Sequence, residues 1–168
     1  MCGGRAGASR RGRRGLIMLA MERGSPRQAD VIALLAQSDA FSAARYPPEE
    51  NYLVDSDFLG APGVLFFVAR EDGRAAGCAA LVIGRGGQAE IRRMVVDEAA
   101  RGRGIGRALL AALERAAAQN SVSLIQLETG TLSEGALALY SACGFRRCAP
   151  FGDYTAGAYS VFMEKALG

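Results

Sequence analysis

Several short, mostly apolar stretches bounded by polar turn residues lie in the middle of the chain, which is the pattern of β-strands. Three such stretches follow one another at Val64–Arg70, Ala75–Ile83 and Gln88–Val96. They are separated by the turn sequences Glu71-Asp72-Gly73-Arg74 and Gly84-Arg85-Gly86-Gly87. Such short turns predict an antiparallel meander. In the third strand, alternation predicts that two sets of side chains occupy opposite faces, namely Gln88, Glu90 and Arg92 against Ala89, Ile91, Arg93 and Val95.

Helical spacing replaces this alternation on both sides of the meander. Ser25-Pro26 offers an N-cap followed by proline, and apolar residues from Val31 to Phe41 then form one stripe. A second helix is expected over Glu49–Leu59. After the meander, the pattern predicts helices over Gly104–Gln119 and Ser133–Ala142. The remaining strands are expected at Leu16–Glu22, Ser123–Glu128, Phe145–Cys148 and Tyr159–Glu164.

This order of elements predicts one α+β (mixed α/β) domain over residues 16–168. We expect a central, mostly antiparallel, twisted sheet of about six to seven strands, flanked by about four helices. Residues 1–15 are rich in arginine and glycine and have no periodicity, so they are expected to be disordered. Met18 and Met21 are alternative starts, which leaves open whether residues 1–17 belong to the native protein.

Composition excludes several classes of function. The net charge of +3 depends on five arginines in residues 1–15, and without them 15 basic and 17 acidic residues remain. The domain is therefore not basic, so nucleic-acid binding is not expected. No apolar run approaches the length of a membrane-spanning helix, so no membrane partner is expected either. Four cysteines without a CxxC pair indicate free thiols in the reducing cytoplasm.

The chain contains no histidine. A Ser-His-Asp triad or a Cys-His pair is therefore impossible, and a metal site is not expected. Any acid–base chemistry must use a carboxylate, tyrosine, cysteine, lysine, water or the backbone. The single lysine, Lys165, lies near the end of the sequence, so a catalytic lysine is not expected.

A glycine-rich loop between a strand and a helix is the strongest chemical signal. In Arg101-Gly102-Arg103-Gly104-Ile105-Gly106-Arg107, three glycines allow the backbone to approach a ligand closely. The helix N-terminus and the arginines favour phosphate, and diphosphate in particular. The dinucleotide pattern G-x-G-x-x-G fails because Arg107 occupies its third glycine position, and no Gly-Lys-Ser/Thr tripeptide of a Walker A loop exists.

The spacing Arg-x-x-Gly-x-Gly instead resembles motif A of the GNAT superfamily of acetyl-CoA-dependent N-acetyltransferases. Met94-Val95-Val96-Asp97 is similar to the strand that precedes the loop in that family. Ala136-Leu137-Ala138-Leu139-Tyr140, followed by Cys143-Gly144-Phe145, resembles its second signature, A-x-x-L-Y-x-x-x-G-F. The resemblance extends from about Leu16 to Lys165 and implies a GNAT-like fold of the small, single-domain bacterial type.

The resemblance implies that acetyl-CoA is the co-substrate. The main chain of Met94, Val95 and Val96 would bind the pantetheine arm. The pyrophosphate would lie on Gly102, Arg103, Gly104, Ile105, Gly106 and Arg107, with Arg101 beside them. Ser133 stands where related sequences often have an asparagine that contacts the cofactor, and its hydroxyl can still donate a hydrogen bond there.

The resemblance also implies the catalytic groups. Tyr140 would be the general acid that protonates the departing thiolate. Glu90 and Glu128 are the candidates for the base that receives the proton of the amine, directly or through water. Tyr46, Arg92, Asp153 and Tyr154 are the candidates for contacts with the acceptor.

The predicted function is transfer of an acetyl group to the primary amine of a small molecule in a ternary complex. Acetylation of a protein or peptide amine is the first alternative, and an acyl-CoA-binding sensor without turnover is the second. Either a monomer or a homodimer is compatible with the sequence.

Overall fold

The computed structural model describes residues 18–168, so the expectations for residues 1–17 lie outside it. Within this range, seven strands form one sheet in the order β1-β2-β3-β4-β5-β7-β6. The strands are β1 (Leu19–Arg23), β2 (Val64–Glu71), β3 (Arg74–Ile83), β4 (Gln88–Val96), β5 (Leu124–Gly130), β6 (Arg146–Arg147) and β7 (Ser160–Ala166). The helices are α1 (Ala29–Ala43), α2 (Ser56–Leu59), α3 (Ile105–Gln119) and α4 (Glu134–Ala142). The expected mixed α/β class, strand number and helix number are confirmed.

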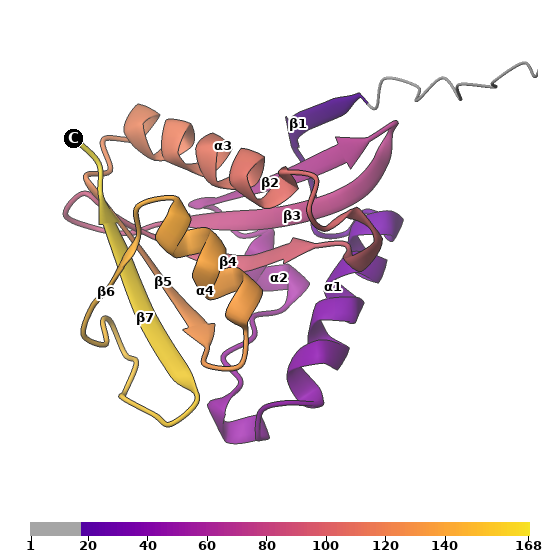
Figure 1. Cartoon of the computed structure of the whole chain (residues 1–168). Helices are drawn as coiled ribbons and strands as arrows, with labels where there is room; N and C mark the ends of the chain where they lie inside the picture. Colours follow the sequence, from indigo (N-terminus) through magenta and orange to yellow (C-terminus); the bar gives the residue numbers. More distant parts are fainter. Residues whose placement is uncertain (1–17) are drawn as a thin grey trace, which may run out of the picture.

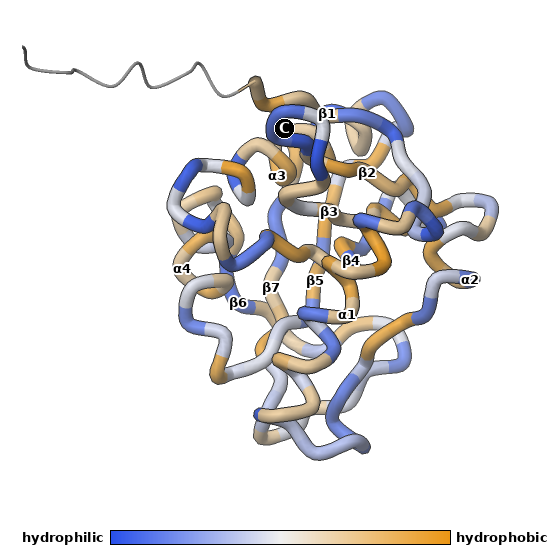
Figure 2. The backbone as a smooth tube through the Cα atoms, turned by 90° about the vertical axis from the view of Figure 1, so that its right-hand side faces the viewer, coloured by the Kyte–Doolittle hydropathy of each residue, from blue (hydrophilic) through white to orange (hydrophobic). Residues whose placement is uncertain are grey.

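Two apolar clusters lie on opposite faces of the sheet (Figure 1). The larger one joins the sheet to α3 and the end of α4, and it includes the α3 stripe of Ile105, Leu109 and Leu113. The smaller one contains Val31, Leu34 and Leu35 of α1 and Leu59 of α2. Figure 2 shows the apolar residues concentrated along the central strands, while the outer loops are mostly polar. The sheet therefore lies between two helical layers. No helix of the described residues is long and apolar enough to cross a membrane.

The segment between α1 and β2 differs from its prediction. The single helix expected over Glu49–Leu59 is wrong: Pro48–Glu50 forms a 3-10 turn, and α2 is a separate four-residue helix. Extended residues separate the two elements. Asp55 is the N-cap of α2, and its carboxylate accepts a hydrogen bond from the Phe58 amide at 2.8 Å, which fixes the start of this helix. The start of the first helix also differs, since its N-cap is Gln28 and not Ser25.

Strand β4 contains a bulge that reverses the predicted faces of its second half. Ala80 of β3 is opposite Arg92, but Cys78 is opposite Val95, so β4 has one extra residue between these pairs. Arg93 in this stretch has a left-handed φ of 50°. Val95 consequently packs with α1 in the smaller cluster, and the prediction that it shares a face with Ile91 is wrong.

Strands β4 and β5 are parallel neighbours over only part of their length. Their pairing begins at Gln88 with Leu124 and ends at Ile91 with Leu127. Both strands continue beyond this point, to Val96 and Gly130, without pairing to each other. Their arrowheads diverge in Figure 1. The divergence exposes backbone groups of β4 along the edge that faces β5 and opens the sheet where the candidate site lies.

Candidate active site

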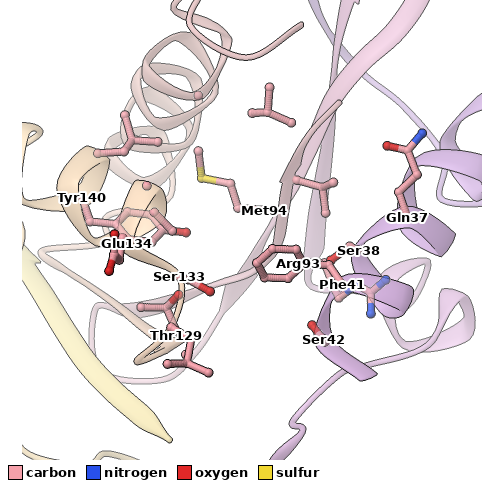
Figure 3. A pocket seen from close by; sticks show the side chains of 18 of the residues that line it. Gln37, Ser38, Phe41, Ser42, Arg93, Met94, Thr129, Ser133, Glu134 and Tyr140 are labelled. Atoms are coloured by element: carbon pink, nitrogen blue, oxygen red, sulfur yellow. The ribbon is translucent and has the colours of Figure 1, made fainter. Parts of the chain in front are cut away.

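A cavity of about 1590 Å³ occupies the opening between β4 and β5. One wall is formed by α4 and the residues before it, including Ser133 and Tyr140, and the opposite wall by α1, including Ser38 and Phe41 (Figure 3). Met94 of β4 lies between these walls. The cavity extends from the glycine-rich loop to the segment that follows α1. Its lining includes predicted cofactor contacts and predicted acceptor contacts, so both groups of residues face one space.

The glycine-rich loop forms one end of the cavity. Gly102 and Gly104 have φ angles of 76° and 82°, in the left-handed region that side chains rarely adopt. A Cβ built on either residue would meet no atom within 4 Å, so their open faces leave room for a ligand. Gly104 is also the N-cap of α3, so the unpaired amides of the first helical turn begin at this loop. These features fit a diphosphate group.

The loop arginines divide into two groups. Arg101 and Arg107 line the cavity. The guanidinium of Arg103 instead donates to Glu71 at 2.8 Å and to the carbonyl of Ala99 at 2.9 Å, and Arg103 does not line the cavity. Its side chain therefore stabilises the loop against β2, and any role toward an anion falls to its backbone. Of the other predicted cofactor contacts, Met94, Val95, Val96, Ile105, Gly106 and Ser133 all line the cavity.

Tyr140 lies at the middle of the cavity wall, near the end of α4. Only 6% of the residue is exposed, and its ring packs edge-on against Phe145 at 5.7 Å between centroids. Burial raises the pKa of the phenol above its usual value, and the nearby negative charge of Glu128 raises it further. The phenol is consequently held in its protonated form, which is the form that can donate a proton.

Glu128 lies on β5, one residue beyond the last pair between β4 and β5. Its carboxylate lines the cavity and accepts a hydrogen bond from Ser160 Oγ at 2.7 Å. Burial raises the pKa of Glu128, and the charges of Glu90 and Glu50 raise it too, while Ser160 and Arg92 act in the opposite direction. A carboxylate with a raised pKa is better suited to accept a proton from a substrate near neutral pH.

Glu90 is engaged by other protein groups. Its Oε1 accepts hydrogen bonds from the Tyr154 hydroxyl at 2.6 Å and from Arg92 at 3.1 Å. Arg92 also donates to the Tyr154 hydroxyl and to the carbonyl of Tyr52, the latter at 2.7 Å. Burial raises the pKa of Tyr154, and the hydrogen bond to Glu90 raises it further. Glu90 does not line the cavity, whereas Arg92 and Tyr154 do.

The predicted acceptor residues are only partly brought together. Tyr46, Arg92 and Tyr154 line the cavity, but Asp153 is exposed and does not. Tyr46 extends from the segment after α1 to the far wall: its hydroxyl lies 3.1 Å from Ser133 Oγ and accepts a hydrogen bond from the Leu132 amide at 3.1 Å. A Cβ on Gly130 would collide with this hydroxyl, so the absence of a side chain there makes room for the tyrosine.

The sequence did not identify several other residues that line the cavity. Glu50 lines the cavity from the 3-10 turn, Leu132 from the loop before α4, and Tyr159 from the loop before β7. Glu50 lies four residues after Tyr46, a predicted acceptor contact, but nothing in the sequence separates it from its neighbour Glu49. Leu132 and Tyr159 have no motif of their own. Among residues 18–168, no group of three or more potential ligands could hold a metal ion.

Known proteins match the residues that form this cavity. A model of the acetyltransferase (GNAT) family matches residues 31–145, which include α1, β4, the glycine-rich loop and Tyr140. The chain belongs to the GNAT family. The resemblance drawn from the two sequence motifs is confirmed, and the protein is an acyltransferase of the N-acetyltransferase class.

Individual members agree with this assignment over nearly the whole domain. The IAA acetyltransferase of Azospirillum brasilense is 41% identical over 146 residues, which cover 86% of this chain and 95% of that protein. A candidate acyl-CoA N-acyltransferase from Klebsiella pneumoniae has a crystal structure with a TM-score of 0.76. It is 33% identical and covers 90% of this chain and 99% of its own. A GNAT fold is therefore established.

One structural neighbour shows this fold with a bound ligand. A Bacillus subtilis acetyltransferase in complex with CoA has a TM-score of 0.67 at 21% identity, covering 89% of this chain and 99% of its own. At this identity the likeness concerns the fold alone.

Proposed function

We propose that this GNAT protein transfers the acetyl group of acetyl-CoA to the primary amine of a small molecule, by direct attack in a ternary complex. The observation that carries the proposal is the continuity of the cavity. It runs from the open glycines of the phosphate-binding loop, past Tyr140 and Glu128, to the segment after α1. Donor and acceptor can therefore meet in one cavity, where alignment alone accelerates the reaction.

The donor half of the proposal rests on backbone geometry. The unpaired edge of β4 beyond Ile91 offers amide and carbonyl groups to the pantetheine arm, and Gly102 and Gly104 offer an open surface to the pyrophosphate. Arg101 and Arg107 supply positive charge at the same end. Acetyl-CoA, when bound there, provides the activated acyl group.

Two side chains then transfer the protons. Glu128 receives a proton from the acceptor nitrogen, whose lone pair forms the new bond to the acetyl carbon. Tyr140 donates its proton to the sulfur as the carbon–sulfur bond breaks. The products are an amide and the CoA thiol. We assign the role of base to Glu128 and not to Glu90, because the Glu90 carboxylate is bound by Tyr154 and Arg92 outside the cavity lining.

The bridge formed by Tyr46 supports a small acceptor over a peptide. Its hydroxyl contacts Ser133 and the Leu132 amide, so the side chain spans the acceptor half of the cavity. An extended peptide needs a groove that is open on both sides of the reacting amine, and this bridge obstructs one side.

Release of the CoA thiol tests the proposal. Acetyl-CoA is incubated with the protein and a panel of primary amines, amino acids and short peptides, and the free thiol is measured with a chromogenic disulfide. Amine-dependent release with small amines, and acetylated product by mass spectrometry, is the expected result. Release only with peptides would support the protein-acetylating alternative. Tight CoA binding without any turnover would support a sensor.

A further inference from the structure

Glu50 is a cavity-lining acid without a partner in the described part of the chain. It ends the 3-10 turn Pro48–Glu50, and its Oε2 is buried without any hydrogen-bond partner among residues 18–168. The backbone of Gly157 approaches this carboxylate so closely that a Cβ there would lie 2.5 Å from Oε2. A buried carboxylate oxygen without a donor is costly, so it indicates a place for a missing hydrogen-bond donor or cation.

The neighbouring protein cations do not neutralise Glu50. Arg92 directs its guanidinium to Glu90, Tyr154 and the carbonyl of Tyr52. The guanidinium of Arg45 lies 3.7 Å from the centroid of the Phe41 ring and donates to the carbonyl of Phe41.

The charge of Glu50 acts instead on another acid. It raises the pKa of Glu128, whereas Arg92 lowers it, and both carboxylate residues line the cavity. Arg92 supplies positive charge near Glu128, but its guanidinium is already paired with Glu90.

Aromatic and apolar side chains also line this cavity. Tyr46 and Tyr159 pack edge-on at 6.1 Å between centroids. Three large apolar residues of the cavity lining are unusually exposed: Leu53 at 38%, Leu132 at 52% and Tyr159 at 37%. Exposed apolar side chains gathered at the rim of a cavity indicate a surface for an apolar ligand. Tyrosine rings also stabilise a nearby ammonium group.

We propose that Glu50 binds the acceptor as its ammonium ion and selects amines with an apolar or aromatic body and no carboxylate beside the nitrogen. This inference rests on the proposed acetyl transfer and adds the class of acceptor. The ammonium donates a hydrogen bond to Glu50 and delivers one proton to Glu128, which passes it to solvent. The neutral amine then attacks, and the ionised Glu128 receives the second proton that the nitrogen loses as the amide forms. A carboxylate next to the nitrogen would bring a second negative charge toward Glu50 and Glu128, which is unfavourable.

Phenethylamine and phenylalanine test the inference because they differ only by a carboxylate. The protein is expected to favour phenethylamine. Glu50→Gln is expected to raise the KM for phenethylamine about tenfold or more, because a charge-assisted hydrogen bond is lost. The KM for acetyl-CoA should stay within about twofold, since Glu50 is remote from the phosphate loop along the cavity. Glu50→Gln should also reduce the discrimination against phenylalanine.

Glu49→Gln is the matched control. Glu49 lies on the same turn, but it is exposed and does not line the cavity, so its variant should keep both KM values. Equal phenethylamine KM values in the two variants, or a preference for phenylalanine, would overturn the role of Glu50 alone. Loss of acetyl-CoA binding in Glu50→Gln would make the residue structural and also overturn it. Absence of thiol release with every amine would instead overturn the acetyl-transfer function, and the inference with it.

Discussion

The hydroxyl of Tyr46 lies 3.1 Å from Oγ of Ser133, although 87 residues separate them in sequence. Tyr46 lines the cavity from the segment after α1, and Ser133 is the N-cap of α4, where the sequence resemblance predicts a cofactor contact. The serine side chain forms no capping hydrogen bond to the helix, so its hydroxyl is available to the tyrosine. The two walls of the cavity are therefore linked by hydrogen bonds at their open end.

Gly130→Ala tests this link without changing either hydroxyl. A Cβ on Gly130 would collide with Tyr46 Oη, so the tyrosine must move and lose its contacts to Leu132 and Ser133. We expect a several-fold higher acceptor KM and improved use of bulkier amines or short peptides. Steady-state kinetics with a short and a long amine measure both effects.

A double-mutant cycle with Tyr46→Ala shows whether the effect passes through the tyrosine. Once the ring is removed, the added methyl group has nothing to displace, so Gly130→Ala should have little further effect. Additive losses in the double variant would mean that Gly130 acts on the backbone of β5 and not on the bridge.

Gly104→Glu is predicted to abolish CoA binding. The substitution places a side chain and a negative charge where the loop and the α3 N-terminus present an anion-binding surface. Gly73→Glu is a suitable control, because Gly73 has φ of 84° against 82° for Gly104, and neither has an atom within 4 Å of an added Cβ. Both variants therefore carry the same backbone strain and the same charge. Calorimetric titration with CoA should find an affinity close to that of the unmodified protein only in Gly73→Glu.

The parts of the site that depend on short stretches of chain could be predicted from the sequence. The glycine-rich loop and the α4 signature each combine a turn, a helix start and an apolar pattern within about ten residues. Their positions on α3 and α4 agree with the structure, with helix boundaries shifted by a single residue at most. The GNAT family followed from these two motifs and is confirmed.

The parts of the site that depend on contacts between distant residues could not be predicted from the sequence. The β4 bulge breaks the two-residue alternation, and Arg93 is held there by α1: its guanidinium donates to the Leu35 carbonyl and pairs with Asp39 at 2.6 Å. Only the packed structure reveals these partners. The same holds for Glu50, whose turn orients it inward while the adjacent Glu49 stays exposed. The side chain of Arg103 turns toward Glu71 for a reason of the same kind.

Tyr140→Phe is predicted to lower kcat by about 10²-fold or more, because the proton donor for the departing sulfur is lost. The substituted ring still fits against Phe145, and no hydrogen bond to the hydroxyl exists among residues 18–168, so thermal stability should change little. The KM for acetyl-CoA should also be nearly unchanged. Parallel losses of kcat and CoA affinity would assign Tyr140 a structural role. A panel of CoA titrations and melting curves distinguishes the two cases.

Ser160→Ala is predicted to move the acid limb of the pH profile to higher pH. Ser160 Oγ donates to the Glu128 carboxylate at 2.7 Å, which stabilises the charged form and lowers the pKa of Glu128. Without this hydrogen bond, the pKa that burial already raises should rise further, by about one unit for a hydrogen bond to a charged group. A base must be deprotonated to act, so kcat/KM should fall only on the acid side and reach its usual value at higher pH.

The pH profile of kcat/KM in two further variants completes this argument. Ser141→Ala, at an exposed position of α4 outside the cavity lining, should leave the limb in place. Glu128→Gln should remove the limb together with most of the activity, because the group that titrates is gone. If the limb persists in Glu128→Gln, the base is another group, and a shift in Ser160→Ala must then have a different origin. If the limb moves to lower pH in Ser160→Ala, the hydrogen bond does not stabilise the carboxylate, and the assignment of Glu128 as the ionised base fails.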